Sequence, residues 1–155
     1  MNKKILGLMI VLAIVAIGPA AALDETVVIG DIDFNVPDGF MEIANNATIN
    51  EKEVNNSISY VVNGKIFEKG DDVVAINVSD YGEFDIANDF IKQNPGKTDD
   101  INGIDGYLKK DGNITTFSYV LDNELVTVSV SNDNLLSDFI RVWLNLFILE
   151  WQTIN

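Results

Sequence analysis

Carboxylates dominate the residues of this chain that could perform chemistry. The sequence has 24 Asp and Glu residues against 10 Lys and Arg, and it contains neither histidine nor cysteine. Serine-histidine-aspartate triads, imidazole or thiolate metal sites and cysteine nucleophiles are therefore excluded. Paired carboxylates, such as those used in glycoside hydrolysis, remain available. No acidic pair stands on an apolar segment that would raise one pKa, so we expect solvated carboxylates.

The lysines and aromatic residues indicate neither a lysine-activated nucleophile nor a ligand-stacking site. A serine-lysine dyad requires a desolvated lysine, whereas the lysines near strand signals lie in polar stretches beside turns: Lys65, Lys69, Lys109 and Lys110. The sequence has no glycine-rich phosphate loop. Aromatic residues mostly fall on strand positions, where packing is expected rather than ligand stacking: Tyr60, Phe67, Tyr107, Phe117 and Tyr119. We expect no catalytic residue and no cofactor.

Two acidic segments match calcium-binding loops only in part. Asp31, Asp33 and Asn35 place oxygen ligands at alternate positions, as an EF-hand loop does, but Val36 stands where the loop requires glycine. The segment 99–103 lacks a third ligand at the required position. Alternation along a strand produces the same spacing without a metal. We therefore expect no specific metal site.

Asn-x-Ser/Thr sequons are the more informative local signals. Asn46, Asn55 and Asn113 begin such sequons in segments that we expect to be loops or turns, as an attached glycan requires. Asn77 begins a fourth sequon, but it lies in an expected strand. The first three are candidate glycosylation acceptors, which would make the chain a glycoprotein.

Residues 1–22 have the three parts of a secretory signal peptide. Lys3 and Lys4 form a basic start, residues 5–17 are apolar, and small residues end the segment at Ala22. The apolar run is shorter than the roughly 20 residues that a membrane-spanning helix needs. We therefore predict cleavage between Ala22 and Leu23, with retention as an uncleaved anchor as the alternative. The absence of cysteine closes the lipoprotein route and favours a bacterial or archaeal envelope.

Charge limits the partners of the mature chain. The formal net charge is -14 at pH 7, and removal of Lys3 and Lys4 with the leader gives -14 − 2 = -16. Such a body is repelled by nucleic acid and by anionic lipid surfaces. We expect a secreted or cell-envelope protein outside the cytoplasmic membrane, for which cations and cationic partners remain available.

Hydrophobic alternation predicts most of the strands. Residues 26–36 alternate as one half-buried strand, and residues 41–56 have little periodicity and are expected to form a loop. Residues 58–62 and 66–68 flank Asn63-Gly64, a dipeptide typical of a tight hairpin turn, with a second turn signal at 69–72. A buried strand is expected at 73–79. Three further strands, at 104–110, 114–121 and 124–131, are expected to form an antiparallel meander.

Two helices are expected. Residues 84–93 have apolar side chains at helical spacing, with Asp85 as a cap. A C-terminal helix is expected from about Leu135, capped by Ser131 or Asp133. Beyond Trp143 the apolar residues occur all round the helix, so one sheet face cannot cover them. We therefore expect self-association or membrane contact, or an altered chain ending, at Leu144, Leu146, Phe147, Ile148, Leu149 and Trp151.

Three phrases of the sequence carry a family resemblance: FNVPDGF at 34–40, IDGYL at 104–108 and YVLD at 119–122. They are similar to uncharacterised small exported proteins of methanogenic archaea. The order of elements also resembles the PsbP/Mog1/DcrB-like α/β/α sandwich group. The resemblance implies an accessory, assembly or binding protein and carries over no site residue.

The expected protein is thus a leader at 1–22 followed by a single α+β domain at 23–155. Its antiparallel sheet has about six strands, and its two main helices are the mid-chain and C-terminal ones. The expected function is a non-catalytic, exported, acidic binding or cell-envelope accessory module. The alternative is a carboxylate-dependent extracellular enzyme such as a glycosidase, recognisable by two carboxylates facing each other in a cleft.

Overall fold

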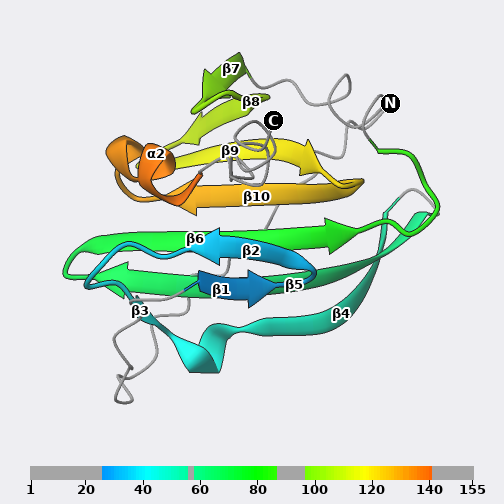
Figure 1. Ribbon diagram of the computed structural model, residues 1–155, viewed down its shortest axis with the longest axis horizontal. Helices are drawn as coiled ribbons and strands as arrows, with labels where there is room; N and C mark the ends of the chain where they lie inside the picture. Colours follow the sequence, from blue (N-terminus) through cyan, green and yellow to red (C-terminus); the bar gives the residue numbers. More distant parts are fainter. Residues whose placement is uncertain (1–25, 56–57, 87–96, 141–155) are drawn as a thin grey trace, which may run out of the picture.

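The computed structural model describes residues 26–55, 58–86 and 97–140. Strands make up 65% of the described residues, and the helix among them has 7 residues. The expected α+β sandwich with about six strands and two main helices is therefore wrong. The described part of the chain is a mainly antiparallel β fold with an eight-stranded sheet and a two-stranded sheet (Figure 1).

The two-stranded sheet is a hairpin of β1 (Thr26–Ile29) and β2 (Ile32–Asn35). The alternation predicted for residues 26–36 is present, but the chain reverses at Gly30, whose φ is 62°. Glycine adopts this conformation without a Cβ penalty. A Cβ at Gly30 would also lie 3.1 Å from a methyl carbon of Val78, so the turn packs closely on the larger sheet.

The larger sheet joins all the remaining strands. Its order is β3-β5-β6-β10-β9-β8-β7, and β4 also pairs with β5. The meander β8-β9-β10 is therefore connected to the β5-β6 hairpin through the pairing of β10 with β6. The strands are β3 (Met41–Glu42), β4 (Thr48–Asn55), β5 (Ile58–Lys69), β6 (Asp72–Asp80), β7 (Lys97–Ile101), β8 (Ile104–Asp111), β9 (Ile114–Leu121) and β10 (Glu124–Val130).

The hydrophobic core lies on one face of this sheet, which we call the core face. The β1–β2 hairpin covers β5 and β6, and the helical segment packs on β10 (Figure 1). Several cross-strand pairs on the core face are apolar, among them Val78–Val126 and Ile76–Val128. Burying each such side chain stabilises the fold by roughly 1.5–3 kcal/mol. The fully buried large side chains include Phe67, Phe117, Phe139, Ile76, Ile140, Val74, Val126, Val128 and Val130.

The hairpin turn expected at Asn63-Gly64 is not formed. β5 runs straight through this dipeptide, and the chain turns instead at Gly70, whose φ is 63°. Gly64 pairs with Asn77 on β6, and a Cβ there would lie 2.2 Å from the Asn77 side-chain oxygen. The Asn63 side chain accepts a hydrogen bond from the Asn50 N–H at 2.9 Å. Both residues therefore serve contacts between neighbouring strands rather than a turn.

Residues 41–56, expected to be a loop, contain β3, a 3₁₀ turn η1 (Ala44–Asn46) and β4. Both short strands pair with β5, at its two ends. The interior residues of β4 are exposed on both faces. This strand has no buried side, so it lacks the apolar alternation by which a strand is recognised.

The helical part of the described chain consists of η2 (Asp133–Leu135) and α2 (Leu136–Phe139). Asn132, rather than Ser131 or Asp133, is the N-cap, since its side-chain oxygen accepts from the Asn134 N–H at 3.2 Å. The backbone is extended again at Ile140. Of the expected mid-chain helix, residues 84–86 are not helical and residues 87–93 lie outside the described residues.

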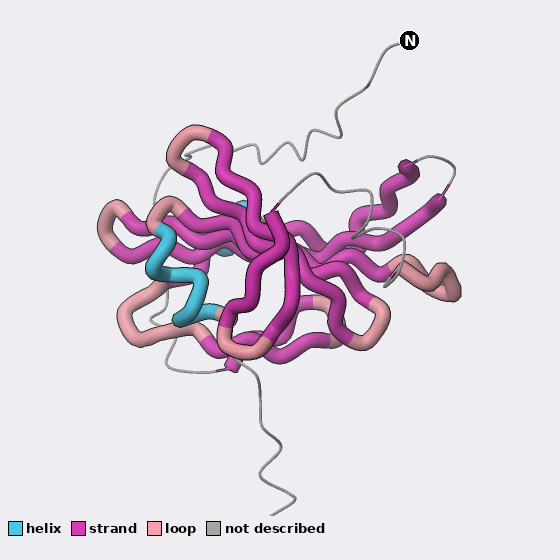
Figure 2. The backbone as a smooth tube through the Cα atoms, turned by 90° about the horizontal axis from the view of Figure 1, so that it is seen from above, coloured by secondary structure: helices cyan, strands magenta, loops and turns pink. Residues whose placement is uncertain are grey.

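The strands are rotated relative to one another in the view from above (Figure 2). This rotation is the twist expected of antiparallel sheets. None of the helices in the described ranges is both long enough and apolar enough to cross a membrane.

Candidate functional site

Four carboxylates from three separate parts of the chain meet at one end of the larger sheet. Glu124, the first residue of β10, pairs directly with Asp80, the last residue of β6. Asp122 lies in the turn before β10, and Asp31 lies in the β1–β2 turn. The charges of Asp31, Asp80 and Asp122 all act on Glu124. We call Asp31, Asp80, Asp122 and Glu124 the acidic end.

Electrostatics at the acidic end disfavour the ionised form of Glu124. Burial raises the pKa of Glu124, and the negative charges of Asp31, Asp80 and Asp122 raise this pKa further. Like charges directly opposite each other on neighbouring strands are destabilising. The fold therefore holds this carboxylate in a place where protonation, or a nearby cation, would be favourable.

The Asp122-Asn123 turn builds the acidic end and anchors a neighbouring loop. Both residues have positive φ, 50° and 66°, which Asp and Asn tolerate better than other non-glycine residues. The Asn123 amide donates to the carbonyl oxygens of Gly82 and Phe84, each at 3.2 Å. Asp80 accepts a hydrogen bond from the Gly82 N–H at 2.7 Å. These contacts fix the loop after β6 against the start of β10.

A tyrosine pair lies at the same end of the sheet but on the face opposite Asp80, since Tyr60 alternates with Val61, the cross-strand partner of Asp80. Tyr81 follows Asp80 directly, and its ring stacks on Tyr60 with centroids 4.7 Å apart and an interplanar angle of 19°. The Tyr60 hydroxyl donates to Glu53 at 2.6 Å. Burial, this hydrogen bond and the charge of Glu53 raise the pKa of Tyr60, and burial and Glu53 raise that of Tyr81. Both phenols therefore stay neutral at physiological pH.

The acidic end suits recognition of positive charge. Carboxylates accept charge-assisted hydrogen bonds from Lys and Arg. Within the described ranges, no group of three or more Asp, Glu, His or Cys residues is placed to hold a metal ion. Among the described residues, the acidic end is thus a charged surface rather than a preformed ion cage.

Of Asp31, Asp33 and Asn35, which were considered as calcium ligands, only Asp31 belongs to the acidic end. Asp33 is exposed on β2, where its alternation with buried Ile32 and Phe34 accounts for the spacing. In the segment 99–103, the Asp100 carboxylate accepts the Gly103 N–H at 3.1 Å and closes the β7–β8 turn.

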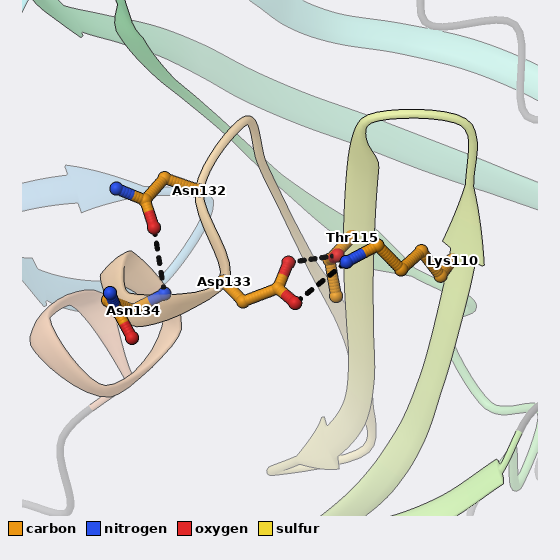
Figure 3. A network of polar contacts seen from close by, with 5 residues as sticks. All are labelled: Lys110, Thr115, Asn132, Asp133 and Asn134. Carbon is orange, nitrogen blue, oxygen red and sulfur yellow. Dashed lines mark hydrogen bonds and ion pairs between the residues drawn. The ribbon is translucent and has the colours of Figure 1, made fainter.

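Three of the four lysines considered for a serine-lysine dyad contact a carboxylate or a backbone carbonyl oxygen. Lys65 pairs with Glu42 at 3.0 Å, and Lys69 donates to the Asp38 carbonyl oxygen at 2.8 Å. Lys110 pairs with Asp133 at 2.9 Å. Figure 3 shows that Asp133 also accepts from the hydroxyl of buried Thr115, so this carboxylate ties β8 and β9 to the helical segment.

The candidate glycosylation acceptors occupy different settings. Asn113 is exposed in the β8–β9 turn, as predicted. Asn46 lies in η1 and Asn55 ends β4, so neither is in the plain loop that was expected. Asn77 lies in β6, as predicted. The cleavage site at Ala22 and Leu23, and the apolar residues from 144 to 151, lie outside the described residues.

Sequence reasoning missed that Asp80, Asp122 and Glu124 belong to a common site. The Asp122-Asn123 turn was visible in the sequence, but the pairing of β10 with β6 was not. Comparison with known proteins adds no further assignment: no family model, no curated protein and no solved structure matches this chain.

Proposed function

We propose that this protein is an exported, non-catalytic binding module whose acidic end recognises a cationic partner. The observation that carries the proposal is the cross-strand pair of Glu124 and Asp80, with Asp31 and Asp122 nearby. This pairing of like charges costs folding free energy, and a bound cationic group would offset that cost. The net charge of -14 attracts such a partner from a distance.

The binding test uses an oligolysine peptide as the probe and calorimetry as the readout. Asp80→Asn combined with Glu124→Gln should weaken binding about tenfold at low salt, because it removes the focused negative charge. The matched control, Asp71→Asn with Asp105→Asn, removes two exposed carboxylates from other turns and strands. Equal losses in both variants would show that only the overall charge matters and would overturn the proposal.

The raised pKa of Glu124 also favours the second candidate function, a carboxylate-dependent enzyme. A general acid in glycoside hydrolysis needs such a raised pKa, with a second carboxylate nearby. Incubation with a panel of polysaccharides, followed by a reducing-end assay, separates the two functions. Hydrolysis that Glu124→Gln abolishes and Asp71→Asn preserves would replace the binding function with catalysis.

Export is part of the proposed function and rests on the three-part leader. N-terminal sequencing of protein recovered outside the cytoplasmic membrane should begin at Leu23. Full-length chain in the membrane fraction would show instead that residues 1–22 are retained as an anchor.

A further inference from the structure

Among the described residues, strand β4 is an open edge of the larger sheet. In the part of the chain that the structure describes, β4 pairs with β5 only. Its interior residues are exposed, and it carries the two most exposed large hydrophobic side chains of the described residues, Ile49 at 74% and Val54 at 70%. An edge strand with unpaired backbone groups is a template for addition of another strand.

A β-bulge brings these two apolar side chains to one face of β4. Thr48 pairs with Gly64 and Glu51 pairs with Val62, so Ile49 and Asn50 share a single partner position on β5. Alternation from Thr48 places Ile49 on the core-face side. Alternation from Glu51 places Val54 on the same side. Without the extra residue, the two apolar side chains would lie on opposite faces.

The other face of β4 is acidic. Glu51 and Glu53 share it, and Glu53 accepts the Tyr60 hydroxyl hydrogen bond there. The exposed edge therefore presents negative charge on one face and apolar groups on the other. Lys52 lies on the apolar face, where the aliphatic part of a lysine side chain can cover hydrophobic surface.

A second copy of this chain does not fit the edge well. In an antiparallel pair with two-fold symmetry, the residue at the centre lies directly opposite its own copy. The centre of β4 is Glu51-Lys52-Glu53, so a two-fold pair centred on any of these three residues places like charges opposite each other. Such pairs are destabilising, and charged residues on edge strands commonly prevent self-association.

We propose that β4 binds an extended segment of another protein that alternates basic and apolar residues. The segment adds as a further strand, with backbone hydrogen bonds to β4 supplying affinity and alternate side chains supplying specificity. Its basic residues face Glu51 and Glu53, and its apolar residues face Ile49 and Val54. This surface is separate from the acidic end, so the proposal goes beyond the proposed function and does not depend on it.

The test compares three peptides of equal composition and charge. The first alternates lysine and valine, the second is the same peptide N-methylated at every residue so that neither edge can donate backbone hydrogen bonds, and the third has its lysines and valines in separate blocks. The alternating peptide should bind about tenfold more tightly than either control, because only it can form the strand ladder with matched faces. Its amide shift changes in NMR spectra should centre on β4. Equal binding by the N-methylated peptide would overturn strand addition.

Variants separate this edge from the acidic end. Glu51→Lys should weaken binding of the alternating peptide about tenfold, since it reverses a charge on the acidic face. Val54→Thr keeps strand propensity and removes apolar contact, so it should weaken binding less but measurably. Asp80→Asn with Glu124→Gln should leave this binding largely intact. If Asp80→Asn with Glu124→Gln abolishes binding while Glu51→Lys does not, the proposed function survives and the β4 edge fails. A dimer in sedimentation that Glu51→Lys alters would also overturn the proposal, because it would show that a second copy occupies β4.

Discussion

At Gly106 on β8, the packing leaves no room for a methyl group. A Cβ at this position would lie 2.4 Å from Cζ of Phe117 and 2.6 Å from the Ser118 carbonyl oxygen. Phe117 is fully buried in the core, and a backbone carbonyl in a paired strand cannot move away without breaking the ladder. Glycine here is required by the close approach of two strands, not by a turn.

Gly106→Ala should therefore destabilise the protein by about 2 kcal/mol or more, as overpacking of a rigid core does. Gly64→Ala is the matched control, because it also lies in a strand but its closest neighbour is the terminal oxygen of the Asn77 side chain, which can rotate away, and the nearest backbone atom, the Ile76 carbonyl oxygen, is 3.2 Å from the Cβ position. The control should lose roughly half as much stability or less. Urea unfolding of both variants measures the difference. Equal losses would show that β8 can shift to relieve the contact.

At the scale of elements, one carboxylate joins the helical segment to the β8–β9 hairpin. Hydrogen bonds from Lys110 and Thr115 lower the pKa of Asp133. A lowered folded-state pKa means that this group stabilises the fold above its unfolded-state pKa, near 3.8. The stabilisation is lost as the pH falls through the still lower folded-state pKa.

Asp133→Asn should therefore reduce stability at neutral pH, and the difference from the wild type should vanish in strongly acidic solution. Unfolding by urea across a pH series measures this difference. Asp138→Asn is a suitable control, because it removes an acidic residue from the same helical segment. A deficit in Asp133→Asn that persists unchanged at low pH would show that the asparagine disturbs packing rather than charge.

The elements that could be predicted are those in which local signals agree. Strands β8, β9 and β10 alternate in hydrophobicity and are separated by Asp-Gly-Asn and Asp-Asn turns, so the meander was found with nearly correct bounds. Strand β6 was found because it is an apolar run. Strand β4 was missed because both of its faces are exposed, and an edge strand without a buried side has no periodic signal.

Other errors arose where tertiary contacts override local preference. Asn63-Gly64 favours a turn in isolation, but pairing with β6 and the Asn50 contact keep it inside β5. The apolar spacing from Leu135 predicted a long helix, although α2 ends at Phe139 and the backbone is extended at Ile140. The acidic end could not be predicted because Asp80 and Glu124 meet only through the pairing of strands that are distant in the sequence.

At the scale of the whole molecule, charge repulsion opposes folding. The chain has 24 acidic residues against 10 basic ones, and folding brings these acidic residues closer together than they are in the unfolded chain. The acidic end concentrates this repulsion, because Glu124 lies opposite Asp80 and near two further carboxylates. The described ion pairs, Lys65–Glu42 and Lys110–Asp133, lie among other residues and leave the acidic end uncompensated.

Added sodium chloride should therefore stabilise the protein. Raising the salt concentration from roughly 0.01 M to 0.15 M shortens the screening length from about 30 Å to about 8 Å. The shorter screening length reduces the repulsion between carboxylates. The midpoint of urea unfolding should rise with salt, urea being chosen because it is uncharged. The variant carrying Asp80→Asn and Glu124→Gln should be more stable at low salt and gain less from added salt. The control with Asp71→Asn and Asp105→Asn should gain nearly as much stability from added salt as the wild type. An identical salt response in all three proteins would show that the repulsion is not concentrated at the acidic end.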